Sequence, residues 1–374
     1  MDQIITRKFR TLLITHLTGD TVYVYDDSAP YIENIVIVTS ISLIGENKTS
    51  TIIEPSYDYY TISIRTNNVT IRGFTINCTS IGGSCIISRG VSYTTISDNI
   101  LLNGKGGIFL GSDLGQNNYN QIVGNKISGC VKAIYASSPR FHTISNNIIT
   151  DNQEIIQLFN AQHVTISYNI ITMNDYSLDI EYLQDGEIYN NTIMHNDGGI
   201  FIVGNNNTIR NNYIGENKGP GNHGFGIMIV ESENTVIKDN NIINNSWKGI
   251  DIKYSSNIEI THNNLKENLK GSFIISGISR GVKISQNNII EKHPRFVYFM
   301  LIPVFNIIVF FGNYWNNAYL HQKFVFGIFG LVIFEGGGQF PYYFPPIFLP
   351  IPGFKVDLKP AQEPYNIPGM GRLI

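Results

Sequence analysis

The sequence predicts an all-β fold, a single-stranded right-handed parallel β-helix of about 11 to 12 coils closed by a C-terminal cap. Two observations support this prediction. An asparagine recurs in steps of 21 to 28 residues, with an apolar residue three positions before it and another two positions after it. Short stretches such as GIFIV, GIMIV and GIDIK alternate apolar residues at period two, which is typical of strands. Self-similarity at such a period indicates a solenoid in which one repeat makes one coil.

The recurring asparagine predicts a ladder of side chains that stack from coil to coil. Its ten positions are Asn99, Asn125, Asn147, Asn169, Asn191, Asn212, Asn240, Asn263, Asn287 and Asn313. A second row follows five positions later, at Asn152, Asn174, Asn196, Asn217, Asn245 and Asn268. Equivalent residues lie roughly 4.8 Å apart, so each amide can hydrogen-bond its neighbour in the next coil. Asparagine also tolerates the left-handed backbone of a sharp turn. We therefore interpret both rows as structural.

The two ends of the chain differ from the repeat. We expect residues 1–17 to be an N-terminal cap or a truncated leader region without a convincing signal peptide, and residues 18–317 to be the β-helix. Residues 318–374 are aromatic and rich in proline, which favours a cap over the last coil. The uncharged stretch 296–311 contains proline and asparagine and keeps the repeat register, so we favour a buried coil over a transmembrane helix.

The charge and the cysteine content bear on two questions, whether the protein binds nucleic acid and whether it contains disulfides. The net charge is −3 with no basic stripe, which argues against nucleic acid. Three cysteines do not make a disulfide framework. Cys78 and Cys85 flank a short turn, and the sequence leaves open whether they pair or remain buried thiols. Cys130 occupies a position of the second asparagine row.

One strand of each repeat predicts a face of the solenoid that is apolar and aromatic. Alternation places eight residues outward in a first row, namely Phe109, Tyr135, Gln157, Asp179, Phe201, Met228, Asp251 and Phe273. A second outward row contains Phe159 and Glu181. Aromatic rings spaced by coils suit the stacking of sugar rings, and carboxylates suit sugar hydroxyls. The candidate ligand-binding residues are Phe109, Tyr135, Phe159, Phe201, Asp251 and Phe273. The alternative is that the tail or a second subunit covers this face.

Asp179 and Glu181 form a candidate catalytic pair. Residues two apart on a strand have backbones roughly 7 Å apart. This approaches the roughly 6.5–9.5 Å between the carboxyl groups of inverting glycosidases. A solvated strand face would carry the same two side chains.

Several segments carry a family resemblance. GDTVYVYDDSAPYIENI, SLIGEN, NVTIRGFTI, the N-N-x-I repeats, GNYWNN and the tail VDLKPAQEPYNI resemble right-handed β-helix repeat proteins of the NosD type, over roughly residues 18–368. These belong to a carbohydrate-binding and sugar-hydrolase superfamily common among surface proteins of archaea. The resemblance implies an extracellular or envelope location. The signatures of pectin hydrolases and pectate lyases are absent from the sequence.

Three functional hypotheses follow. The first is a non-catalytic surface protein that binds polysaccharide or a surface protein along the aromatic face, without a cofactor. The second is a polysaccharide lyase or glycoside hydrolase that uses Asp179 and Glu181. The third, implied by the NosD resemblance, is copper delivery, because copper favours histidine and methionine ligands. Its candidate ligands are Met173, Met194, His195 and His223.

Overall fold

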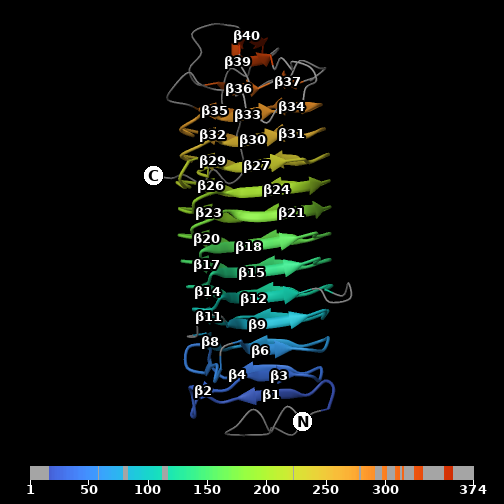
Figure 1. Ribbon diagram of the computed structural model, residues 1–374, viewed down its shortest axis with the longest axis vertical. Helices are drawn as coiled ribbons and strands as arrows, with labels where there is room; N and C mark the ends of the chain where they lie inside the picture. Colours follow the sequence, from blue (N-terminus) through green and yellow to red (C-terminus); the bar gives the residue numbers. More distant parts are fainter. Residues whose placement is uncertain are drawn as a thin grey trace, which may run out of the picture.

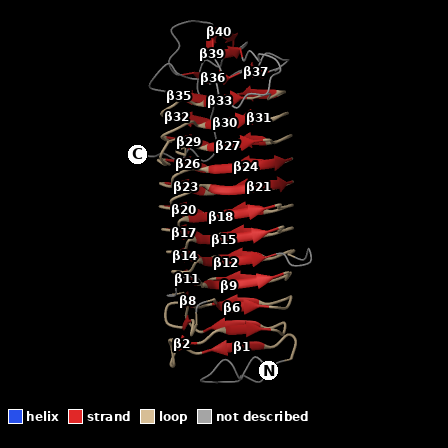
Figure 2. Ribbon diagram, viewed as in Figure 1, coloured by secondary structure: helices blue, strands red, loops and turns tan. Residues whose placement is uncertain are grey.

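The computed structural model describes residues 17–290 except positions 58, 79–82, 112–116, 222 and 278, together with the backbone of five strands between residues 297 and 356. The described residues contain strands and connecting turns and no helix (Figure 2). Successive coils stack along one long axis, with the chain advancing steadily from one end to the other (Figure 1). The predicted all-β solenoid is confirmed.

Three parallel sheets run the length of the stack, because each coil contributes one strand to each sheet. Sheet A has the order β1 (Thr21–Val24), β4 (Ser42–Gly45), β7 (Thr70–Arg72), β10 (Thr95–Ser97), β13 (Gln121–Val123), β16 (Thr143–Ser145), β19 (Thr165–Ser167), β22 (Glu187–Tyr189), β25 (Thr208–Arg210), β28 (Val236–Lys238), β31 (Glu259–Thr261), β34 (Val282–Ser285), β37 (Ile308–Phe311). Sheet B has the order β2 (Tyr31–Ile32), β5 (Ile52–Glu54), β8 (Thr75–Asn77), β11 (Ile100–Leu102), β14 (Lys126–Ser128), β17 (Ile148–Thr150), β20 (Ile170–Thr172), β23 (Thr192–Met194), β26 (Tyr213–Gly215), β29 (Asn241–Ile243), β32 (Asn264–Lys266), β35 (Asn288–Ile290), β38 (Tyr314–Trp315). Sheet C has the order β3 (Ile35–Ile37), β6 (Tyr60–Ile64), β9 (Ser84–Arg89), β12 (Gly106–Gly111), β15 (Lys132–Ser137), β18 (Glu154–Phe159), β21 (Leu178–Gln184), β24 (Ile200–Asn205), β27 (Ile227–Val230), β30 (Ile250–Lys253), β33 (Phe273–Ser276), β36 (Val297–Met300).

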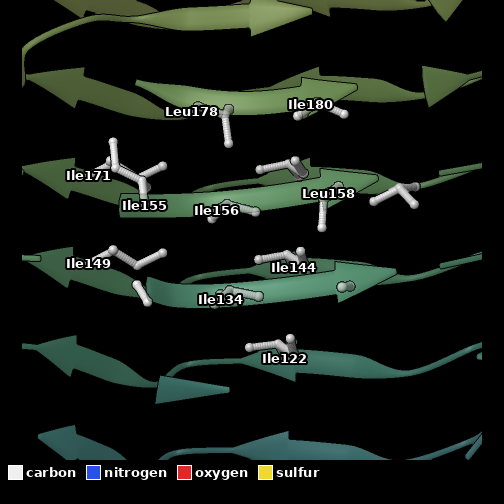
Figure 3. Packing of buried hydrophobic residues seen from close by; sticks show 14 of the residues in the cluster. Ile122, Ile134, Ile144, Ile149, Ile155, Ile156, Leu158, Ile171, Leu178 and Ile180 are labelled. Carbon is white, nitrogen blue, oxygen red and sulfur yellow. The ribbon is translucent and has the colours of Figure 1, made fainter. Parts of the chain in front are cut away.

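Columns of isoleucine fill the space between the sheets. Ile122 pairs with Ile96 and Ile144 in the neighbouring strands of sheet A, and all three are almost fully buried. Figure 3 shows such columns, with Ile149 and Ile171 stacked from sheet B and Ile134 and Ile156 from sheet C. β-branched side chains pack well on a pleated surface, and each buried isoleucine contributes about 1.5–3 kcal/mol. The repeat therefore builds one continuous core.

The first asparagine row forms the predicted ladder. The backbone N–H and the Nδ2 of Asn147 both donate to Oδ1 of Asn169, at 2.9 and 3.0 Å. The same Nδ2 donates to the backbone oxygen of Ile122 at 2.9 Å. This pattern recurs at every step from Asn99 to Asn287. Asn313 lies outside the described residues. The second row, from Asn152 to Asn268, is bonded in the same way.

The left-handed backbone belongs to the residue before each ladder asparagine. Asn146, Tyr168 and Asn190 have φ values of 57°, 57° and 55°, whereas the ladder asparagines have no positive φ. The expectation that the ladder residue itself takes the left-handed turn is wrong. The left-handed residue turns the chain from sheet A toward sheet B, and the next side chain then points into the stack, where its amide bonds the neighbouring coil.

Sulfur continues the second row where asparagine is missing. Cys78, Cys85 and Cys130 are free, buried thiols, so the pairing left open for Cys78 and Cys85 is absent from this structure. The backbone N–H of Cys130 donates to Oδ1 of Asn152 at 3.0 Å. At row position Gly104, which has no side chain, the Sγ of Cys85 instead contacts two backbone oxygens, 3.6 and 3.5 Å away. A Cβ built on Gly104 would lie 3.3 Å from that sulfur.

The segment 296–311 carries strands β36 and β37, which pair in parallel with β33 and β34. No helix among the described residues has the length and apolar character needed to cross a membrane. Beyond it, β39 (Phe324–Leu331) and β40 (Leu349–Val356) form an antiparallel pair within the expected C-terminal cap. Residues 1–16 and the rest of the expected cap lie outside the described residues.

Candidate functional site

The outer face of sheet C presents the predicted first row of side chains. Register pairs Phe109 with Tyr135, Tyr135 with Gln157, and Gln157 with Asp179. Asp179 in turn pairs with Phe201, and the row continues through Met228 and Asp251. The rows therefore run along the solenoid axis, as a long ligand would.

The end of this row departs from the prediction. Phe273 pairs with Ile250 and is fully buried, so it belongs to the core and is unavailable to a ligand. Ile274 takes the outward position beside Asp251. Matching the glycine-led segments GIDIK and GSFII would set Gly271 beside Gly249, whereas in the structure Ser272 lies beside Gly249. A slip of one residue turns every side chain of a strand to the opposite face.

Four aromatic residues of this face form two separate pairs. The rings of Phe109 and Tyr135 are stacked, with centroids 4.6 Å apart and planes 17° apart. Phe159 meets Tyr182 edge to face at 5.5 Å, and these two side chains are 45% and 51% exposed. The second pair is thus the accessible one, and it stands beside Glu181, which pairs with Phe159.

Five polar side chains lie close together on strands β15, β18 and β21 of this face. Lys132 Nζ lies 2.5 Å from Glu154 Oε2 and donates to Gln157 Oε1 at 2.6 Å. Asp179 and Glu181 follow on the next strand. Period-two alternation does not point to Lys132 and Glu154, because they lie three positions before Tyr135 and Gln157 of the outward row. Their opposite charges, 22 residues apart and so one coil apart, are the signal that would have revealed them.

The environment of Asp179 shifts its titration. Burial, followed by the negative charges of Glu181 and Glu154, raises the pKa of Asp179 from 3.8 to about 6. A hydrogen bond from Gln157 opposes the shift. Oδ1 of Asp179 is buried and has no hydrogen-bond partner in the described part of the chain. Such an oxygen is a position where a ligand donor would be favourable.

A backbone irregularity lies directly beside this carboxyl group. The register between β21 and β24 shifts between Ile180 and Leu183, and Tyr182 takes a φ of 59°. A bulge re-aims the side chains near it and is over-represented next to active sites. The bulge lifts the Tyr182 ring onto the surface beside Glu181. Period-two alternation cannot reveal a bulge, so this irregularity is visible only in the structure.

Asp251 lies three coils beyond Asp179, which corresponds to roughly 14 Å. Its Oδ2 lies 3.3 Å from the Nζ of Lys253, while its Oδ1 is buried without a partner among the described residues. Burial raises the pKa of Asp251, and the charge of Lys253 opposes this shift. Asp251 is therefore a buried, lysine-paired carboxylate that stands apart from the Asp179 cluster.

The structure places the four candidate copper ligands at different turns and strands of the solenoid. Met173 and His195 occupy equivalent left-handed turn positions in successive coils, with φ values of 57° and 56°. Met194 lies on β23, and Nδ1 of His195 faces Glu216 at 3.8 Å. His223 packs its backbone against Gly198 and acts electrostatically on Asp197. Among the described residues, no three His, Cys, Asp or Glu side chains are grouped closely enough to hold a metal ion.

Comparisons with known proteins agree with the architecture. The family model described as "Right handed beta helix region" matches residues 117–221 and 156–289. No curated protein sequence matches significantly.

Among solved structures, the Dettilon tailspike protein has a TM-score of 0.58 at 13% identity, over 76% of this chain and 64% of the tailspike. A mannuronic acid specific polysaccharide family 6 lyase from human gut microbiota has a TM-score of 0.54 at 14% identity, over 82% and 84% of the two chains. A family 6 polysaccharide lyase from Pseudopedobacter saltans has a TM-score of 0.53 at 12% identity, over 80% and 85%. At these identities the likeness concerns the fold, a right-handed parallel β-helix.

Proposed function

We propose that this protein binds a polysaccharide along the outer face of sheet C, at a site centred on Asp179. The ligand lies parallel to the solenoid axis and crosses successive coils. It contacts the polar cluster around Asp179 and the exposed rings of Phe159 and Tyr182. We also propose that the protein acts at the cell surface or in the envelope, as the family resemblance implies. A surface protein that covers the same face is the alternative partner.

The unpartnered Oδ1 of Asp179 is the observation that carries this proposal. A buried polar atom without a hydrogen bond costs about 1–3 kcal/mol. Native structures rarely retain such an atom without a reason. A sugar hydroxyl is a neutral donor of suitable size, and its binding would remove that cost. A bound sugar would also exclude water, which strengthens the hydrogen bond.

The exposed rings supply the apolar half of the site. Sugar binding sites combine apolar surface with a few placed polar groups. Phe159 and Tyr182 stand at the edge of the polar cluster and are about half exposed, so the C–H faces of a sugar can pack on them. The structural neighbours named as polysaccharide lyases share this fold and support a carbohydrate ligand.

A glycan array with the purified protein tests the proposal. Phe159→Ser is a conservative probe, because Ser137 holds the same row position one coil earlier. Asp179→Asn keeps the shape of the side chain and removes its charge. Tyr168→Asn is the matched control, because Tyr168 is 54% exposed on a different edge of the solenoid and its neighbours in that turn row are Asn146 and Asn190.

We expect the wild type and Tyr168→Asn to bind the same glycans. Phe159→Ser and Asp179→Asn should each weaken binding at least about tenfold, equivalent to about 1.4 kcal/mol. Equal weakening by the control would indicate a general loss of structure. An array on which the wild type binds no glycan would refute the proposal.

The raised pKa of Asp179 favours a second candidate function, the hydrolysis of the bound polysaccharide. A carboxyl group with a pKa of about 6 keeps its proton under mildly acidic conditions and can donate it to a glycosidic oxygen. Glu181 would then act as the base that activates water, and the roughly 7 Å repeat along a strand suits an inverting mechanism.

Release of reducing sugars from the bound glycan measures this activity. The rate should fall as the pH rises above about 6, and Asp179→Asn should abolish it. Inversion at the anomeric carbon, followed by NMR, would support Glu181 as the base. Binding without any release of sugar at pH 4–8 would leave binding as the only function of this face.

A further inference from the structure

A hollow of about 270 Å³ opens on sheet C near the N-terminal end of the solenoid. Its lining includes Tyr59, Tyr60, Arg65, Ser88 and Arg89. It lies on the same outer face as Phe109, because Ile87 in its lining pairs with Phe109 in the next coil. Its volume suits one sugar unit rather than a long segment.

Two arginines occupy neighbouring positions in the lining of this hollow. Ile64 pairs with Ser88, so Arg65 and Arg89 are direct neighbours on adjacent strands, with backbones about 4.8 Å apart. Like charges that face each other across a sheet are destabilising. Arg89 donates to the hydroxyl of Tyr59 at 3.1 Å, and neither arginine is ion-paired with a carboxylate in the described ranges. An anion between them would remove the repulsion.

The hollow also has aromatic walls. The rings of Tyr59 and Tyr60 are packed edge to face, with centroids 5.7 Å apart. Positive charge and aromatic walls together match a sugar that carries a carboxylate.

We infer that the hollow formed by Arg65, Arg89 and Tyr59 binds a uronic acid unit of the polysaccharide that crosses Asp179. This inference rests on the proposed function and specifies its ligand. The planar guanidinium groups bind the planar carboxylate, which is the geometry that arginine favours. The sugar ring packs against Tyr59.

The other end of the site requires neutral sugars. Asp179 lies four coils beyond Arg89, about 19 Å along the axis. The carboxylates of Glu154 and Glu181 lie near Asp179, and Lys132 is already bound to Glu154. A second carboxylate there would meet like charges. The ligand is therefore a heteropolysaccharide in which uronate and neutral units occur in the same chain, rather than a homopolymer of uronate.

A panel of uronate-containing heteropolysaccharide oligosaccharides tests this inference, each with its carboxyl-reduced counterpart. Reduction converts the carboxylate to a neutral hydroxymethyl group and leaves the rest of the sugar intact. Binding is measured by calorimetry for the wild type, Arg65→Gln, Arg89→Gln and the control Arg72→Gln. Arg72 lies in the same coil as Arg89, but on sheet A and outside the hollow. Thermal unfolding of each variant confirms that it is folded.

We expect at least one carboxylated oligosaccharide to bind about tenfold more tightly than its reduced form, because a charge-assisted hydrogen bond is worth about 1.5–3 kcal/mol. Arg65→Gln and Arg89→Gln should abolish this difference, and Arg72→Gln should retain it. Added salt should narrow the difference in the wild type.

In one outcome, the wild type binds the carboxylated and the reduced oligosaccharides with equal affinity, while Phe159→Ser weakens the binding of both. This result would overturn the uronate subsite and leave the proposed function intact. If the folded Arg65→Gln and Arg89→Gln variants lose affinity equally for the carboxylated and the reduced oligosaccharides, the subsite is also overturned, because the arginines would then not recognise the carboxylate. Binding of neither form, nor of any neutral glycan, would overturn both the inference and the proposed function.

Discussion

Replacing Asn169 by alanine tests the energetic role of the ladder. The Asn169 side chain is 1% exposed and makes four hydrogen bonds. Its Nδ2 donates to the backbone oxygen of Ile144 and to Oδ1 of Asn191, both at 2.9 Å. Its Oδ1 accepts the backbone N–H and the Nδ2 of Asn147. Alanine removes all four and leaves the buried backbone N–H of Asn147 without this acceptor.

The expected loss of unfolding free energy is about 3–4 kcal/mol. Orphaning a buried amide costs about 1–3 kcal/mol, and the remaining bonds contribute about 0.5–1.5 kcal/mol each before relaxation. The Nδ2 of Asn147 keeps its bond to Ile122, and the Oδ1 of Asn191 keeps the backbone donor of residue 169, which limits the total. The loss is a large part of the marginal stability of a folded protein.

Urea unfolding followed by circular dichroism measures this loss. Asn146→Gly is the matched control, because Asn146 is exposed in the adjacent left-handed turn and Gly124 holds the same position one coil earlier. The control should change the stability by less than about 0.5 kcal/mol. Hydrogen exchange should also show faster exchange in the coils that flank residue 169, since each coil contacts only its neighbours. A loss below about 1 kcal/mol for Asn169→Ala would refute the ladder as a main source of stability.

Three further outcomes are expected. The pKa of Asp179 is raised in the folded state, so the wild type loses stability as the pH rises from about 4 to about 6. Across that window the unfolding free energy of Asp179→Asn should gain about 1 kcal/mol relative to the wild type. Parallel plots of unfolding free energy against pH for the two proteins would contradict this. Iodoacetamide should modify none of Cys78, Cys85 and Cys130 in the folded protein and all three in urea, as counted by mass spectrometry, because all three are buried and burial raises the pKa of Cys85. Phe273→Ala should cost about 3–5 kcal/mol in urea unfolding because it opens a core cavity, and a loss of glycan binding at unchanged stability would instead place Phe273 on the surface.

Much of the fold followed from the repeat. The ladder positions were correct from Asn99 to Asn287 because a buried amide that bonds the next coil has to recur once per coil. The assignment of inward and outward residues on sheet C was also correct as far as Asp251, because a shift of one residue would expose the isoleucines of that strand. Prediction failed at Phe273, where GSFII allows two alignments of similar pattern and only the pairing with Ile250 distinguishes them.

The candidate site was predicted in part. Asp179, Glu181 and Phe159 were recognised as outward neighbours, because alternation determines the face of a strand. Their surroundings were not recognised. Lys132 and Arg65 belong to other coils, and their proximity to the row depends on stacking.

The amino-acid sequence alone established a parallel β-helix, its ladders, its isoleucine core and one aromatic outer face, because these properties repeat and periodicity records them. The three-dimensional structure established what does not repeat. Burial and charge raise the pKa of Asp179, a bulge exposes Tyr182, and coil stacking brings Arg65 beside Arg89. Each of these depends on the distance between residues in different coils or on a local break in register, and neither quantity is written in a periodic pattern.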